Sequence, residues 1–175
     1  MLITILVWSL LSLGLVSILA WRVNAARFRS IRWWMFALVS GLFWGVFAFI
    51  LHWVYWDSYY RYFTPSFVQW LTPVAMLFYA LVGLGIRWLA LRLPGHPLVN
   101  FCTLGAVESI PEHWIGIYRM HILDIPMFEG VNATSIFIFA FFEYAIYWGV
   151  VSLLAVLLDK FWPRKTARPS SHLQD

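Results

Sequence analysis

Apolar residues in this chain form long uninterrupted runs, which is the pattern of helices that cross a lipid bilayer. Three runs contain no charged residue, namely residues 1–21, 33–56 and 62–86. A fourth run near the C-terminus contains a single Glu. Each run is close to the roughly 20 residues that a helix needs to cross the hydrocarbon core of a bilayer. The chain is therefore predicted to be an all-α integral membrane protein, with spanning helices over about residues 2–21, 33–55, 65–92 and 134–158.

Basic residues gather at the ends of these runs and orient them. Ten of the twelve Lys and Arg residues lie within residues 22–32, 87–92 and 160–168. Cationic clusters beside a spanning helix mark its cytoplasmic end. If all three clusters face the cytoplasm, the N-terminus lies outside, the C-terminus lies inside, and the polar segment 97–121 must also cross. We therefore expect a five-crossing helical bundle, with four spans plus a re-entrant or interfacial helix as the alternative.

Composition and charge exclude a soluble domain and a nucleic-acid partner. Hydrophobic residues make up 62% of the chain and charged residues only 11%. The net charge of +4 comes from residues that flank the spans, and no separate basic domain exists. The expected partner is the lipid bilayer, and the expected location is the plasma (inner) membrane. The single cysteine, Cys102, excludes an internal disulfide and a multi-cysteine metal site.

The chain is expected to form one transmembrane domain over residues 1–160. Residues 161–175 are expected to be a basic cytoplasmic tail without fixed structure. No basic residue precedes the first apolar run, and four arginines follow it. This is the reverse of a signal peptide's polarity, so we expect a retained helix.

The polar crossing is predicted to be a broken helix. Residues 97–108 would give about 18 Å of helix, which is half a bilayer. Ser109-Ile110-Pro111-Glu112 then fits a capping box, with proline in the first turn of a new helix. We therefore expect one half-helix to end near Glu108 and another to start near Pro111. Many transporters place ion and substrate sites at such broken helices.

Carboxyl groups within the predicted spans are the main candidates for chemistry. Glu143 lies about 13 Å below the outer end of the last helix, and Glu108 lies at a comparable depth. A charged carboxylate there costs at least about 2.5 kcal/mol, so it is usually paired, protonated or functional. The catalytic or proton-carrying candidates are Glu108, Glu112, His113 and Glu143. Alternatively, Glu112 only closes its own helix cap and Glu143 is a neutral acid bonded between helices.

A second possible site is a divalent metal centre at the outer end of the bundle. Its candidate ligands are imidazole and carboxylate groups, namely His52, His113, His121 and Asp124. Their spacing matches no established metal motif, because the chain has no His-Glu-x-x-His. A weaker alternative is axial ligation of a haem by His52 with His113 or His121.

Small residues recur every four positions in the second predicted helix, at Ala37, Gly41 and Gly45. Such spacing lets two helices approach closely. The approach can take place within one chain, or it can join a homodimer or another membrane partner.

Three classes of function fit this sequence. The first is a proton- or ion-linked carrier or channel component with intramembrane Glu residues. The second is a membrane-embedded enzyme that acts on lipid or an external substrate with Glu/His acid–base or metal chemistry. The third is a non-catalytic structural or assembly subunit of a membrane complex. The carrier follows most directly from buried carboxyl groups beside a broken helix, whereas the small size of the chain and its lack of motifs favour the subunit equally.

Overall fold

The computed structural model describes the backbone of residues 1–59, 65–119 and 128–162. Within these ranges it describes the side chains outside residues 47–59 and 65–72. All the regular structure described is helical: α1 (Leu2–Arg22), α2 (Ala25–Ser30), α3 (Trp33–Tyr59), α4 (Pro65–Ala90), α5 (Pro97–His113), η1 (Trp114–Arg119) and α6 (Ala133–Phe161). In this part of the chain, three helical segments are long and apolar enough to cross a membrane: α1, Pro73–Ala90 of α4, and α6.

The four long apolar runs form α1, α3, α4 and α6, close to their predicted bounds. Local signals explain several helix ends. The side chain of Asn132 accepts a hydrogen bond from the backbone N–H of Ser135 at 2.9 Å, which caps the start of α6. Pro97 occupies the first turn of α5, where its missing N–H costs nothing.

The short helix α2 was not predicted. It lies within the first arginine cluster, where no apolar run indicates a helix. Its local signal is Asn24, whose side chain accepts a hydrogen bond from the backbone N–H of Arg27 at 2.7 Å. Phe28 is the buried residue of this helix and attaches it to the core.

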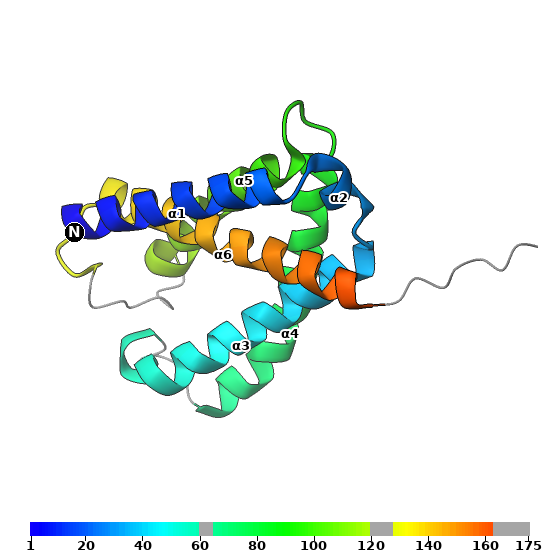
Figure 1. The fold of residues 1–175 in the computed structure, drawn as a ribbon. Coiled ribbons are helices and arrows are strands. Elements are labelled where there is room, and N and C mark those ends of the chain that lie inside the picture. Colours follow the sequence, from blue (N-terminus) through cyan, green and yellow to red (C-terminus); the bar gives the residue numbers. More distant parts are fainter. Residues whose placement is uncertain (60–64, 120–127, 163–175) are drawn as a thin grey trace, which may run out of the picture.

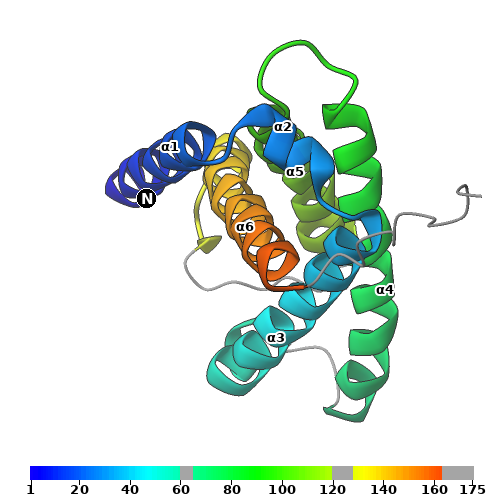
Figure 2. The ribbon, with the colours of Figure 1, turned by 45° about the vertical axis from the view of Figure 1, so that its right-hand side comes forward.

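The long helices form a bundle around α6 (Figures 1 and 2). Helix α6 contacts α1, α3 and α5, and α4 contacts α3 and α5. Figure 1 shows α1, α5 and α6 with roughly aligned axes, α5 running opposite to the other two, while α3 and α4 form a hairpin whose tip lies below them. Helix α4 contacts α5, and its Tyr79 meets Tyr144 and Trp148 of α6.

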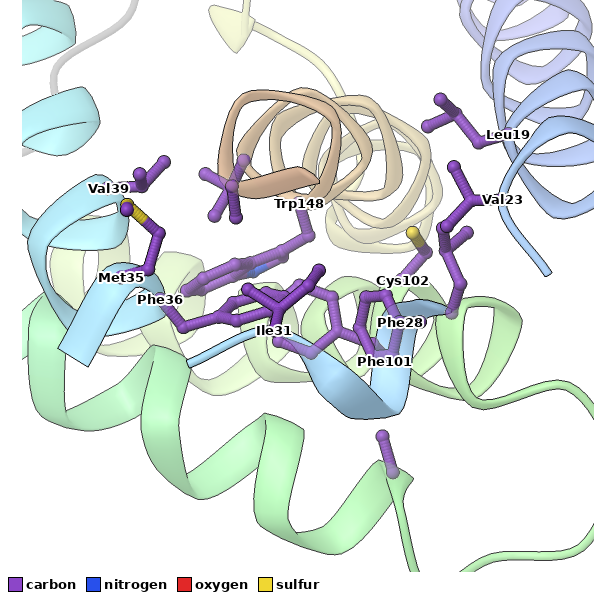
Figure 3. Packing of buried hydrophobic residues seen from close by; sticks show 14 of the residues in the cluster. Leu19, Val23, Phe28, Ile31, Met35, Phe36, Val39, Phe101, Cys102 and Trp148 are labelled. Carbon is purple, nitrogen blue, oxygen red and sulfur yellow. The ribbon is translucent and has the colours of Figure 1, made fainter. Parts of the chain in front are cut away.

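An aromatic cluster fills the centre of the core (Figure 3). Phe36 and Phe101 meet edge-to-face at 5.4 Å between ring centroids, and Phe101 meets Trp148 in the same way at 5.4 Å. Such arrangements are the preferred geometry of aromatic pairs. A Cβ atom at Gly105 would overlap the ring of Trp148. The glycine therefore allows α5 and α6 to pack closely over the indole.

The small residues of α3 are used within the chain. A Cβ atom at Gly41 would lie 2.8 Å from the carbonyl oxygen of Met76, and one at Gly45 would overlap the Met76 side chain. The close contact is therefore between α3 and α4. Binding of a homodimer or another partner at the Ala37/Gly41/Gly45 face stays a prediction. Because α4 already covers Gly41 and Gly45, such a partner would have to contact neighbouring residues of α3.

One end of the bundle is basic and held by ionic contacts. The buried Asp159, at the end of α6, accepts from Arg32 at 2.9 Å and lies 3.4 Å from Arg27. The guanidinium of Arg87 is fully buried and donates to the carbonyl oxygens of residues 28, 29 and 31 at 3.4, 3.2 and 2.5 Å. It lies over the rings of Trp33 and Phe36. The Arg87 side chain thus supplies hydrogen-bond donors and a positive charge to the carbonyl groups at the C-terminal end of α2.

The opposite end of the bundle is joined by apolar contacts. Phe128, Ile136 and Phe139 form a small cluster against the start of α1. Ile117 of η1 also packs on this cluster. The beginning of α5, in contrast, is held at the basic end, where the side-chain amide of Asn100 donates to the carbonyl of Pro94 at 3.0 Å. The segment from α5 to η1 therefore runs from the basic end of the bundle to the other end.

The predicted break in this segment was wrong. Helix α5 continues through Pro111 to His113, and the irregular backbone lies after it, in the π-helical η1. The Ser109 hydroxyl donates back to the carbonyl of Ala106 at 2.6 Å instead of capping a new helix. The Glu112 side chain turns towards α4 and α6, away from the backbone N–H that a capping box would use. The expected continuation to His121 extends beyond the described residues.

Candidate functional site

Polar side chains of α4, α5 and α6 meet in the interior of the bundle, where all three helices are otherwise apolar. We call this group the polar cluster. Its carboxyl and imidazole groups come from α5 and α6, and its hydroxyl groups come from α4 and α6. The members are Tyr79, Glu108, Glu112, His113, Glu143, Tyr144 and Tyr147.

Helical spacing brings the two carboxyl groups of α5 together. Glu108 and Glu112 are four residues apart, so they lie one turn apart on the same face. Their carboxyl groups lie close enough to influence each other's protonation. Because two negative charges in contact repel, such a pair holds a shared proton more readily than it ionises fully. The Oε2 atoms of Glu108 and Glu112 have no hydrogen-bond partner among the described residues.

Two tyrosines link this carboxyl pair to the neighbouring helices. The hydroxyl oxygens of Tyr79 and Tyr144 lie 3.2 Å apart, and both hydroxyl groups lie close to the carboxyl group of Glu112. A tyrosine hydroxyl both donates and accepts, so it can pass a proton along a hydrogen-bonded chain. Helices α4, α5 and α6 thus each supply a group that can carry a proton, and these groups lie close together.

His113 connects the other side of the polar cluster to Glu143. Its Nδ1 lies 3.0 Å from the carbonyl oxygen of Ser109. A carbonyl can only accept, so Nδ1 carries a hydrogen and Nε2 is the atom that gains or loses a proton. Nε2 lies 4.0 Å from Oε2 of Glu143. Both side chains are largely buried, with 6% of the His113 side chain and 20% of the Glu143 side chain exposed.

A pocket of about 120 Å³ borders the polar cluster on the side of α1 and α3. The exposed wall is almost entirely apolar: α6 supplies most of the lining residues, while α1 and α3 each supply one aromatic ring. The lining residues are Trp8, Phe43, Glu143, Tyr144, Ile146, Tyr147 and Val150. Glu143 therefore lies between this pocket and His113.

The four candidates for acid–base or proton chemistry lie together in the structure. Glu108, Glu112 and His113 follow one another on α5, and Glu143 faces them from α6. Sequence reasoning missed Tyr79. The only signal was a hydroxyl-bearing side chain in the otherwise apolar inner half of α4, which does not distinguish it from an interfacial aromatic residue.

The predicted metal ligands fall mostly outside what the structure describes. The side chain of His52 and all of His121 and Asp124 lie outside the described residues. The fourth, His113, belongs to the polar cluster. Within the side chains described, no group of three or more His, Cys, Asp or Glu residues is placed to hold a metal ion. A divalent metal at the outer end stays a prediction.

No protein-family model, curated protein sequence or solved structure matches the chain.

Proposed function

We propose that this protein is a proton-linked carrier or channel component of the plasma membrane, and that the polar cluster is its proton-exchange site. The supporting observation is the contact of Glu112 with Glu108, Tyr79 and Tyr144. These groups belong to three different helices and are enclosed among apolar side chains. Ionisable residues inside a membrane are costly, and they commonly form proton relays in pumps and transporters.

The proposal includes a five-crossing topology with the N-terminus outside and the C-terminus in the cytoplasm. The basic end of the bundle would face the cytoplasm. The segment from α5 to η1, which carries three members of the polar cluster, would then be the fourth crossing. Large apolar side chains on the outer faces of α1 and α4 would contact lipid. Examples are Leu10, which is 62% exposed, and Leu77, which is 63% exposed.

Labelling of single cysteines tests this topology. Pro94 and Glu129 are exposed and lie at opposite ends of the bundle, and each neighbours a glycine with positive φ that is best left unchanged. In a Cys102→Ala background, Glu129→Cys should react with a membrane-impermeant maleimide in intact cells. Pro94→Cys should react only after the membrane is opened. Reaction of both cysteines from the same side would contradict the five-crossing topology.

Proton flux in vesicles tests the function. The purified protein is reconstituted with a pH-sensitive dye inside, and a potassium diffusion potential is imposed. Wild-type protein should carry protons inward. Glu112→Gln keeps the shape of the side chain but cannot release a proton, so the flux should fall at least about tenfold, the order of change that the loss of one essential proton-transfer group produces.

The matched control is Glu129→Gln, because Glu129 is exposed and lies outside the polar cluster. Its flux should equal that of the wild type. Tyr79→Phe should reduce the flux, since it removes a hydroxyl that contacts Glu112. If Glu112→Gln is monodisperse and its flux is unchanged, the polar cluster is not the proton-exchange site.

A further inference from the structure

The pocket beside the polar cluster combines aromatic walls with one carboxyl group. Trp8 comes from α1, Phe43 from α3, and Tyr144 and Tyr147 from α6. Glu143 is the only charged residue among the lining residues. Four aromatic rings around one carboxyl group are the chemistry by which proteins recognise methylated ammonium ions, whose positive charge is attracted to the ring faces.

The size of the pocket limits the ligand to a small group. A cavity of about 150 Å³ in another protein holds one benzene molecule. The present pocket, at about 120 Å³, therefore suits a group of about five heavy atoms, such as a tetramethylammonium ion. A metal ion with its water shell fits less well, because its water molecules would meet rings that cannot accept strong hydrogen bonds.

We propose that this pocket binds a methylated ammonium cation, with Trp8, Phe43, Tyr144 and Tyr147 around the methyl groups and Glu143 as the counter-ion. The inference rests on the proposed function, of which it names the substrate class. When the cation enters, the Glu143 carboxyl group releases its proton to water, and when the cation leaves, the carboxyl group takes a proton back. The exchange conserves charge in the pocket.

The groups that face Glu143 are compatible with this exchange. Helix α5 contributes His113, at 4.0 Å, and Glu112, which acts on Glu143 through its charge. Tyr144 and Tyr147 neighbour it on α6, and the wall residues of α1 and α3 are Trp8 and Phe43, which do not titrate. The Nε2 atom of His113 faces the carboxyl group and can pass the proton on to water without keeping it.

Calorimetric titration of the purified protein with tetramethylammonium tests the proposal. The wild type should bind the cation saturably and release protons, seen as a dependence of the heat on the ionisation enthalpy of the buffer. Choline should bind as well, whereas its uncharged carbon analogue 3,3-dimethylbutan-1-ol should not. Absence of saturable binding, or equal binding of the analogue, overturns the proposal.

Four variants tie the binding to the pocket. Glu143→Gln should weaken binding at least about tenfold, since it removes the counter-ion beside the aromatic rings. Phe43→Leu should weaken it several-fold, whereas Phe43→Tyr should retain it. Phe141→Leu makes the same aromatic-to-aliphatic change outside the pocket and should bind like the wild type. Equal affinity in Glu143→Gln and the wild type overturns the proposal.

Nanodiscs separate the two possible sources of the cation. If the ligand is a free solute, tetramethylammonium should bind equally well in phosphatidylglycerol and phosphatidylcholine discs. If it is the choline headgroup of a lipid, phosphatidylcholine should suppress the binding. If the proton flux depends on Glu112 but no cation binds, only the inference about the pocket is contradicted. Cation binding with a flux unaffected by Glu112→Gln contradicts the proposed function but leaves the pocket as a cation site.

Discussion

Replacing Arg87 with alanine is expected to lower the free energy of unfolding by about 3–5 kcal/mol, because each buried carbonyl left without a donor costs roughly 1–3 kcal/mol. The buried guanidinium donates to three carbonyl oxygens at the end of α2. Alanine would leave these oxygens without a donor and would remove the cation from the rings of Trp33 and Phe36. The change is measured as a shift in the midpoint of unfolding by SDS in mixed micelles.

Arg92→Ala is the matched control for Arg87→Ala. Arg92 is exposed and lies over the ring of Trp88, so its loss should cost less than about 1 kcal/mol. Arg87→Lys should restore only part of the stability, since an ammonium group lacks the planar guanidinium that lies over the rings of Trp33 and Phe36. An Arg87→Ala protein that unfolds at the wild-type midpoint would show that α2 does not depend on this contact.

Trp148→Ala is expected to lower the free energy of unfolding by a similar amount, about 3–5 kcal/mol, because it opens a large cavity in the core. Trp148 is fully buried and contacts Phe101, Tyr79 and Tyr147 through its ring. The same unfolding measurement applies. The control is Trp21→Ala, which removes a side chain that is 76% exposed and should change the free energy of unfolding by less than about 1 kcal/mol.

A double-mutant cycle with Gly105 makes the Trp148 prediction specific. Gly105→Ala alone should destabilise the protein, because the new Cβ atom would overlap the indole. In the Trp148→Ala background the same change should cost much less, since the ring is gone. Additive effects of the two substitutions would contradict the packing of Trp148 over Gly105.

The long helices could be predicted because uninterrupted apolar runs of this length have few alternatives. Helix α2 could not, since six residues among arginines produce no apolar periodicity and only Asn24 indicates its start. The course of the chain at Ser109–Glu112 was predicted wrongly for a physical reason. Tertiary contacts of Glu112 with tyrosines on other helices replaced the local cap that the sequence motif favours.

The candidate site was only partly readable from the sequence. Glu108, Glu112, His113 and Glu143 stood out because charged and titratable groups are rare in apolar segments. The remaining contributors did not stand out. Tyr79, Trp8 and Phe43 lie in helices that are apolar on all sides, so no periodicity shows which of their aromatic residues face inward. Only the packing of α1, α3 and α4 on α6 identifies them.

The ionic contacts of Asp159 have a consequence for how α6 can move. They attach the last turn of the helix to Arg27 and Arg32, whereas its first turns are held by apolar contacts alone. Glu143 lies about 24 Å from Asp159 along the helix axis. A small rotation of α6 about its anchored end would therefore displace Glu143 by a larger distance than any residue near the basic end of the bundle. In the proposed carrier, exposing Glu143 to each side in turn would thus require little rearrangement at the arginine cluster.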